Sequence, residues 1–126
     1  MKTNLTHLKA YNSEVKTPPQ NWLITGGAGY ILRATSLQIP VVLDGVITLA
    51  AATVANAIKP NTTEFLIAAH CSSEPGSTIA LKHLGLNPIL DLDLRLGEGT
   101  GAILSIPIIR SACQVISKMA RISDLT

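Results

Sequence analysis

Short apolar runs alternate with longer segments of helical spacing along most of this chain. The run Val41-Val42-Leu43 follows Pro40, and residues 65–69 form a second continuous apolar run, as in strands that are buried on both faces. Between them, residues 47–58 are rich in alanine and apolar on nearly every side, which predicts a buried helix. This order of strand, helix and strand indicates a parallel α/β sheet.

The same alternation continues after the second run. Residues 70–76 predict a loop, and residues 77–84 predict a helix that ends at Gly85, because glycine is the usual residue just past a helix. Residues 88–92 predict a third strand.

The last third of the chain is helical in pattern. Residues 102–109 and 111–122 carry apolar residues three and four positions apart, and Pro107 predicts a kink between two C-terminal helices. The predicted fold class is therefore α/β, with a parallel, Rossmann-like sheet, flanking helices and C-terminal helices. Loops that follow parallel strands meet at one edge of the sheet, so we expect Asp44-Gly45, residues 70–76 and residues 97–101 to converge there.

Composition changes this picture in one respect. Hydrophobic residues make up 47% of the chain and charged residues only 14%, which is apolar for a free-standing domain and predicts an oligomer or a part of a larger assembly. Residues 1–20 are polar and contain Pro18-Pro19, so they predict a loosely attached arm ahead of a compact unit at 21–126.

Charge and cysteine usage exclude several classes of protein. A net charge of +2 without basic blocks, and an aromatic content of 3%, do not support nucleic-acid binding. Cys71 and Cys113 are far apart, which favours reduced thiols over a disulfide or zinc site. The longest apolar region, 39–58, contains Asp44 and several threonines, so no membrane span is predicted. We expect a cytoplasmic protein, because the N-terminus lacks an apolar signal core.

The stretch from Arg95 to Gly101 is the strongest candidate for chemistry. It places one carboxylate, that of Glu98, among three glycines directly after an apolar run. Glycines allow positive φ angles and close approach to a ligand, so Glu98 is a candidate catalytic base. The alternative is a surface turn with a solvated glutamate.

A second glycine-rich string favours a different class of protein. The string from Leu23 to Ile31, with Gly26 at its first glycine, resembles the first turn of short-chain dehydrogenases and sugar-nucleotide epimerases that bind NAD. Asp44 follows Gly26 by 18 positions, near the spacing of a ribose-binding acid, but Leu32 occupies the place of the third glycine. The helix predicted at 30–37 is also short for a crossover helix. The competing interpretation of the glycines is a small-residue helix start or a close packing contact.

Three motifs occur in an order that is specific when they are taken together. They are Ile39-Pro40-Val41-Val42-Leu43-Asp44-Gly45, then His70-x-Ser72-x-Glu74-x-Gly76, and finally Leu90-Asp91-x-x-x-Arg95-Leu96-Gly97-Glu98-Gly99-Thr100-Gly101-Ala102. By these motifs, residues 39–120 resemble the C-terminal part of the nicotinate-nucleotide:dimethylbenzimidazole phosphoribosyltransferase family, which transfers phosphoribose from nicotinate mononucleotide to dimethylbenzimidazole in cobalamin lower-ligand synthesis.

The resemblance implies a role for each of five residues. Glu98 corresponds to the general base, and Gly45, Ser72, Leu96 and Gly97 correspond to residues that line the ribose phosphate and base site. It implies no cofactor and no metal, and the group of His70, Cys71 and Glu74 supplies no full ligand set. Asp44 is expected to cap the helix that starts near Ile47.

The family chain is longer than this one, and its N-terminal part carries the benzimidazole pocket and a phosphate-binding glycine loop. We therefore expect a truncated enzyme that is inactive alone. It is either a relic that folds, as a homodimer, without turnover, or a chain that works with a partner chain supplying the missing half. The alternative to an enzyme is a non-catalytic assembly module, for which the apolar composition is the argument.

Overall fold

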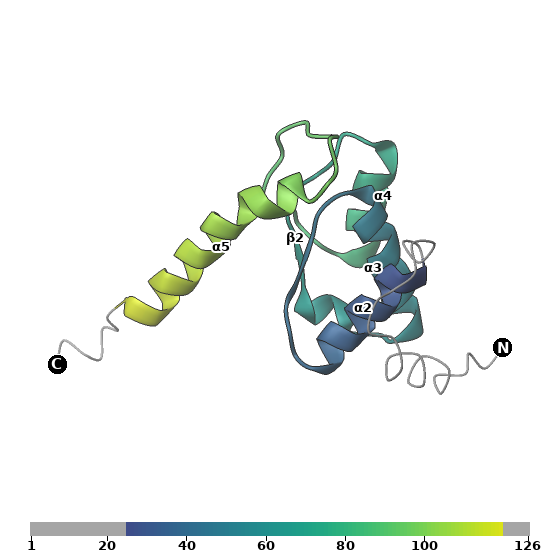
Figure 1. The fold of residues 1–126 in the computed structure, drawn as a ribbon, viewed down its shortest axis with the longest axis horizontal. Coiled ribbons are helices and arrows are strands. Elements are labelled where there is room, and N and C mark those ends of the chain that lie inside the picture. Colours follow the sequence, from purple (N-terminus) through teal and green to yellow (C-terminus); the bar gives the residue numbers. More distant parts are fainter. Residues whose placement is uncertain (1–24, 120–126) are drawn as a thin grey trace.

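The structure is a computed structural model that describes residues 25–119, which form a short parallel sheet and four α-helices, labelled as in Figure 1. The predicted arm at 1–20 lies outside the described residues. Helices α2 (Thr25–Ser36), α3 (Val46–Ile58) and α4 (Pro75–Leu84) gather together, while α5 (Thr100–Lys118) extends away from them (Figure 1).

The sheet consists of the two strands that the apolar runs predict. Strand β1 (Val41–Leu43) pairs in parallel with β2 (Leu66–Ala68), and Val42 lies opposite Ile67 in the register. Helix α3 and a short 3₁₀ helix, η2 (Thr62–Phe65), make the crossover that a parallel pair requires. The predicted α/β class is confirmed.

One face of the sheet carries the hydrophobic core. Leu43, Leu66 and Ala68 point to this face and pack with buried residues of α2, α3 and α4. The helices approach closely because small residues meet: a Cβ added at Gly27 of α2 would lie 2.9 Å from the Ala51 Cβ of α3. The glycine string therefore serves helix packing. Its glycines, from Gly26 to Gly29, lie inside α2, which starts five residues earlier than predicted, and residues 23 and 24 lie outside the described residues.

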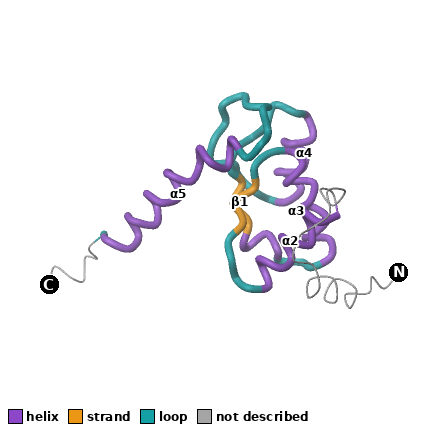
Figure 2. Tube along the Cα trace, in the orientation of Figure 1, coloured by secondary structure: helices purple, strands orange, loops and turns teal. Residues whose placement is uncertain are grey.

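The other face of the sheet is less covered. Val42 and Ile67 point to it, because side chains alternate along a strand, and both are only half-buried. Parallel sheets of α/β proteins normally have both faces covered. Among the described residues, three helices pack beside one face, and α5 leaves the body of the molecule (Figure 2).

The predicted third strand at 88–92 is wrong as a regular strand. Its start follows β2 in parallel, since the Ile89 and Leu90 N–H groups donate to the Ala68 and Ala69 carbonyls. The next two bonds run from Cys71 N–H to the Leu90 carbonyl and from Ser73 N–H to the Leu94 carbonyl. Between these two bonds the chain after β2 advances by two residues, from 71 to 73, while the other segment advances by four, from 90 to 94. The second segment therefore bulges, and within the described residues it forms one isolated bridge, between residues 70 and 90.

The start of one helix also differs from the prediction, for a local reason. Helix α4 starts at Pro75 instead of residue 77, because proline suits the first helical position, where its missing N–H would have no partner. Gly85 ends the helix as predicted, with φ 66°.

The two predicted C-terminal helices are one continuous helix, α5, with Pro107 inside it. Proline removes a single backbone hydrogen bond, and the turns on either side continue. The part of the second predicted helix beyond residue 119 lies outside the described residues. Helix α5 is long and apolar enough to cross a membrane, although the sequence analysis predicted no span. A core helix of a soluble protein meets the same criterion of length and hydropathy.

Candidate active site

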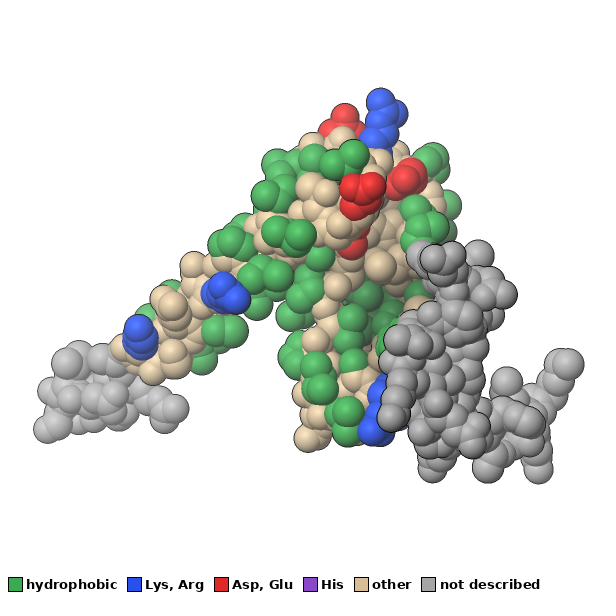
Figure 3. All heavy atoms as spheres, viewed as in Figure 1, with side chains coloured by type: hydrophobic (Ala, Val, Ile, Leu, Met, Phe, Trp, Pro, Cys, Tyr) green, Lys and Arg blue, Asp and Glu red, His purple; other side chains and the backbone are tan. Residues whose placement is uncertain are grey.

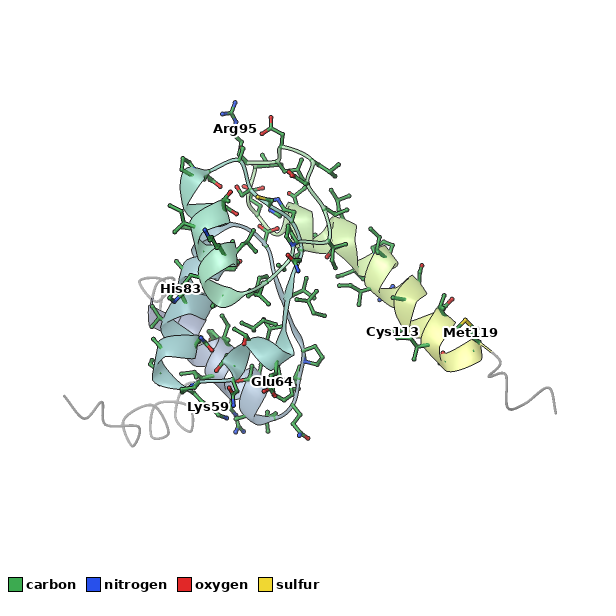
Figure 4. All side chains as sticks on the ribbon, turned by 180° about the vertical axis from the view of Figure 1, so that it is seen from behind. Lys59, Glu64, His83, Arg95, Cys113 and Met119 are labelled. Atoms are coloured by element: carbon green, nitrogen blue, oxygen red, sulfur yellow. The ribbon has the colours of Figure 1, made fainter. Side chains whose placement is uncertain are left out.

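The three predicted loops do converge, at the carboxyl ends of β1 and β2. Loops gather at this end of the molecule in Figure 2, and Arg95 of the third loop lies far from Lys59 and Glu64 at the opposite end (Figure 4). Acidic side chains lie on the same end in the space-filling view (Figure 3). The loops are joined by hydrogen bonds from the third loop to Asp44 and by the packing of His70 and Ser72 against glycines.

Asp44 links the first loop to the third. Its Oδ2 accepts a hydrogen bond from the Gly99 N–H at 3.1 Å, and its Oδ1 accepts one from the Ala102 N–H at 3.0 Å. The prediction that Asp44 caps its own helix is wrong, because α3 has Gly45 at its N-cap and no side-chain cap. Asp44 caps α5 instead, across 55 to 58 residues of sequence.

Glu98 lies at the centre of a left-handed turn. Gly97, Glu98 and Gly99 have φ angles of 75°, 57° and 80°. Glycine adopts this conformation freely, but a residue with a Cβ does so at a cost of about 1–2 kcal/mol. The strained residue of the turn is therefore Glu98, whose side chain is exposed. Such outliers cluster at functional sites.

His70 packs between the first and third loops. Its side chain is 3% exposed, and its Nε2 lies 3.8 Å from Asp44 Oδ1. A Cβ added at Gly101 would lie 2.6 Å from the His70 Nε2, so the first turn of α5 rests directly on the imidazole ring. A Cβ added at Gly45 would lie 3.7 Å from the same nitrogen. The sequence motifs contained His70 without indicating this packing role; its place directly after the apolar run at 65–69 was the available signal.

Ser72 is buried beside Gly45, with 4.0 Å between its Cβ and a Cβ added at Gly45. Its backbone N–H donates to the Ser77 hydroxyl at 3.1 Å, so this amide already has a partner. Its hydroxyl donates to the Glu74 carboxylate. Ser72 therefore offers a ligand its hydroxyl lone pairs rather than an N–H group.

The five predicted site residues thus fall into two groups. Gly45 and Ser72 are neighbours at the strand ends, and Leu96, Gly97 and Glu98 follow one another on the left-handed turn. Leu96 is 70% exposed, and a Cβ added at Gly97 would meet nothing within 4 Å. The connection between the groups is Asp44, which precedes Gly45 and holds Gly99.

No three His, Cys, Asp or Glu side chains come together among the residues that the structure describes.

The fold is of the α/β class, and the candidate site residues lie at the carboxyl edge of its parallel sheet, where α/β proteins commonly bind ligands. A sequence model of a family described as phosphoribosyltransferase matches residues 23–125. The chain belongs to this family, the nicotinate-nucleotide:dimethylbenzimidazole phosphoribosyltransferases, which confirms the resemblance of the sequence motifs.

Individual relatives agree with this assignment. The proteins named nicotinate-nucleotide:dimethylbenzimidazole phosphoribosyltransferase from Salinispora tropica and Desulforamulus reducens are each 50% identical to this chain, over 74% and 80% of its length. The crystal structure of CobT from Thermus thermophilus superposes with a TM-score of 0.72 at 42% identity, covering 75% of this chain and 28% of that one. The chain spans 26% and 29% of the two curated relatives.

Proposed function

We propose that this chain contributes the part of a nicotinate-nucleotide:dimethylbenzimidazole phosphoribosyltransferase that carries the general base. The names of the relatives supply the donor and the acceptor of the reaction. The observation that carries the proposal is the anchoring of the Glu98 turn, through Asp44, to the strand end where Gly45 and Ser72 lie. One carboxylate is thereby held at the edge where α/β proteins bind ligands.

The reaction needs one base. A ring nitrogen of dimethylbenzimidazole attacks C1′ of the ribose, the bond from C1′ to the nicotinate nitrogen breaks, and its electron pair leaves with nicotinate. The other ring nitrogen of the acceptor loses its proton, which the Glu98 carboxylate takes. Such proton transfer contributes about 10²- to 10⁴-fold to a rate. The step balances without a metal or a redox cofactor.

The helix starts suggest where the phosphate binds. Asp44 occupies the N-terminus of α5, whereas the N-terminus of α3 at Gly45 has no side-chain cap. Free N–H groups at a helix start attract anions. We assign the phosphate to the start of α3 and the ribose hydroxyls to Ser72, whose hydroxyl oxygen accepts while its hydrogen is directed to Glu74.

The remaining two residues suit the acceptor base. The exposed Leu96 side chain offers an apolar surface to a flat aromatic ring. Gly97, with no Cβ and open space beside it, lets the ring approach the backbone.

Activity on this proposal requires further polypeptide. The sheet face of Val42 and Ile67 and the exposed apolar residues of α5 are surfaces that a larger fold would cover. We propose that a second copy of the chain covers them without restoring activity, and that activity requires a polypeptide carrying the rest of the family fold. The cytoplasmic location stays a prediction from the sequence.

A reconstitution assay tests the proposal. The purified chain is mixed with the part of the Salinispora tropica relative that lies outside the matched region, and formation of the α-riboside phosphate from nicotinate mononucleotide and dimethylbenzimidazole is followed by chromatography. We expect turnover only in the mixture. Glu98→Gln should lower kcat by about 10²- to 10⁴-fold.

The matched control is Glu64→Gln, which makes the same chemical change at a position at the opposite end of the molecule (Figure 4). It should retain full activity. Equal activity of Glu98→Gln and the unchanged chain would refute the role of Glu98, and turnover by the chain alone would refute the need for a partner.

A further inference from the structure

Asp44 differs from the other carboxylates of the described residues in that both of its oxygens accept hydrogen bonds from backbone amides far away in sequence. The Gly99 and Ala102 N–H groups donate to Oδ2 and Oδ1 at 3.1 and 3.0 Å. Its side chain is 12% exposed. A side chain that accepts from two amides at once, each at an ordinary hydrogen-bond distance, fixes the position of both amides relative to its own backbone.

The turn that Asp44 holds needs an external anchor. Among the described residues, the backbone hydrogen bonds of the turn itself are local, from Thr100 N–H to the Gly97 carbonyl and from Ile103 N–H to the Gly99 carbonyl. These bonds do not connect the turn to the sheet. A non-glycine residue with positive φ persists only where the surroundings impose it, and Asp44 supplies that constraint for Glu98.

We propose that Asp44 is a positioning residue that sets the location of the Glu98 carboxylate relative to the strand ends. The inference rests on the proposed function, in which Glu98 is the base. Asp44 reaches no reacting atom in this scheme, because both of its oxygens are directed to the start of α5. It acts by fixing Gly99, the residue directly after Glu98.

His70 supports the arrangement through packing. Its ring contacts Gly101, so the first turn of α5 packs on His70. Asp44 accepts hydrogen bonds from the amides on either side of this glycine, those of Gly99 and Ala102. The turn is therefore held by two neighbouring features, the polar contacts of Asp44 and the steric contact of His70, whose Nε2 lies 3.8 Å from Asp44 Oδ1. Proton abstraction requires hydrogen-bond reach, and a misplacement of about 1 Å can cost about 10²-fold in rate.

The first experiment measures the hydrogen bonds of Asp44 to the Gly99 and Ala102 amides directly, without an assay of activity. In ¹⁵N-labelled protein, Asp44→Asn is compared with the unchanged chain by amide chemical shifts and hydrogen exchange. Asparagine keeps the shape of the side chain but loses one acceptor oxygen and the charge. We expect the Gly99 and Ala102 amides to shift upfield and to lose exchange protection, while Glu64→Gln leaves both amides unchanged. Unaltered protection at both amides in Asp44→Asn would overturn the inference and leave the proposed function intact.

The second experiment is a double-mutant cycle in the reconstituted enzyme. We expect Asp44→Asn to lower kcat by about 10- to 100-fold without changing KM for nicotinate mononucleotide. In the Glu98→Gln background, the same substitution should have no further effect, because a residue that acts only through Glu98 has nothing left to position. An equal loss in both backgrounds would show a merely structural role and overturn the inference.

A second variant covers a failure of Asp44→Asn to fold. Ala102→Pro deletes one of the two N–H donors and leaves Asp44 itself unchanged, at a position in the first helical turn whose N–H has no intrahelical partner. It should lower kcat in the same direction, and an undiminished kcat would count against the anchor. If no mixture shows turnover, the proposed function fails, and the exchange measurement still decides whether Asp44 holds the turn.

Discussion

Replacing Gly101 by alanine should destabilise the protein, although glycine to alanine in a helix is usually favourable. The normal gain is up to about 1 kcal/mol. At Gly101, however, the new Cβ would overlap Cδ2 of His70 and would lie 2.6 Å from its Cγ and Nε2, which is about 1 Å inside an ordinary contact. The ring is buried and adjoins Asp44 and Gly45, so it has little room to retreat. Overpacking of this kind costs about 1–3 kcal/mol.

Gly29→Ala is the matched control, because Gly29 also lies in a helix and a Cβ added there would meet nothing within 4 Å. Thermal unfolding followed by circular dichroism measures both variants. Each kcal/mol corresponds to roughly 4–8 °C in Tm for a domain of this size. We expect Tm to fall for Gly101→Ala and to rise for Gly29→Ala. Equal increases in the two variants would refute the packing of α5 on His70.

Three further substitutions test other parts of the structure. Ser77→Ala should lower the free energy of unfolding by about 1–3 kcal/mol in urea titrations, because it leaves the buried Ser72 N–H without an acceptor. The control Ser111→Ala, at an exposed position, should change this free energy little. Equal effects of the two substitutions would contradict the hydrogen bond from Ser72 to Ser77. Glu98→Gly should raise the free energy of unfolding, by up to about 1 kcal/mol, through relief of the left-handed strain while it abolishes turnover; a loss of stability would argue against the strain. Gly27→Ala should lower Tm, since its Cβ would lie 2.9 Å from that of Ala51, and an unchanged Tm would argue against this contact between α2 and α3.

The pattern of apolar residues was sufficient to predict the strands and helices that depend on nearby residues alone. The apolar runs predicted β1 and β2, and periodicity predicted α3 and most of α4, because burial on a strand or helix imposes a fixed spacing. Gly85 was readable as a helix end for the same kind of reason. The order of the three motifs likewise indicated the family, which the comparisons confirm.

The errors lie where a partner far away in sequence decides the outcome. Asp44 caps α5 instead of α3, because the carboxyl end of β1 brings it to the start of a helix 55 residues later. The segment after residue 88 does not form a full strand, since two extra residues before Leu94 break its register with the chain after β2. Periodicity carries no information about either pairing.

The sequence by itself determined the class of fold, the family and the candidate base at Glu98, because the spacing of apolar residues and the order of the motifs can be read directly along the chain. Only the tertiary structure decided what holds that base. The turn at 97–99 is strained, and its anchors are a carboxylate from the end of β1 and an imidazole from the end of β2. These groups meet because a parallel sheet brings the carboxyl ends of its strands to one edge, whatever their separation along the chain.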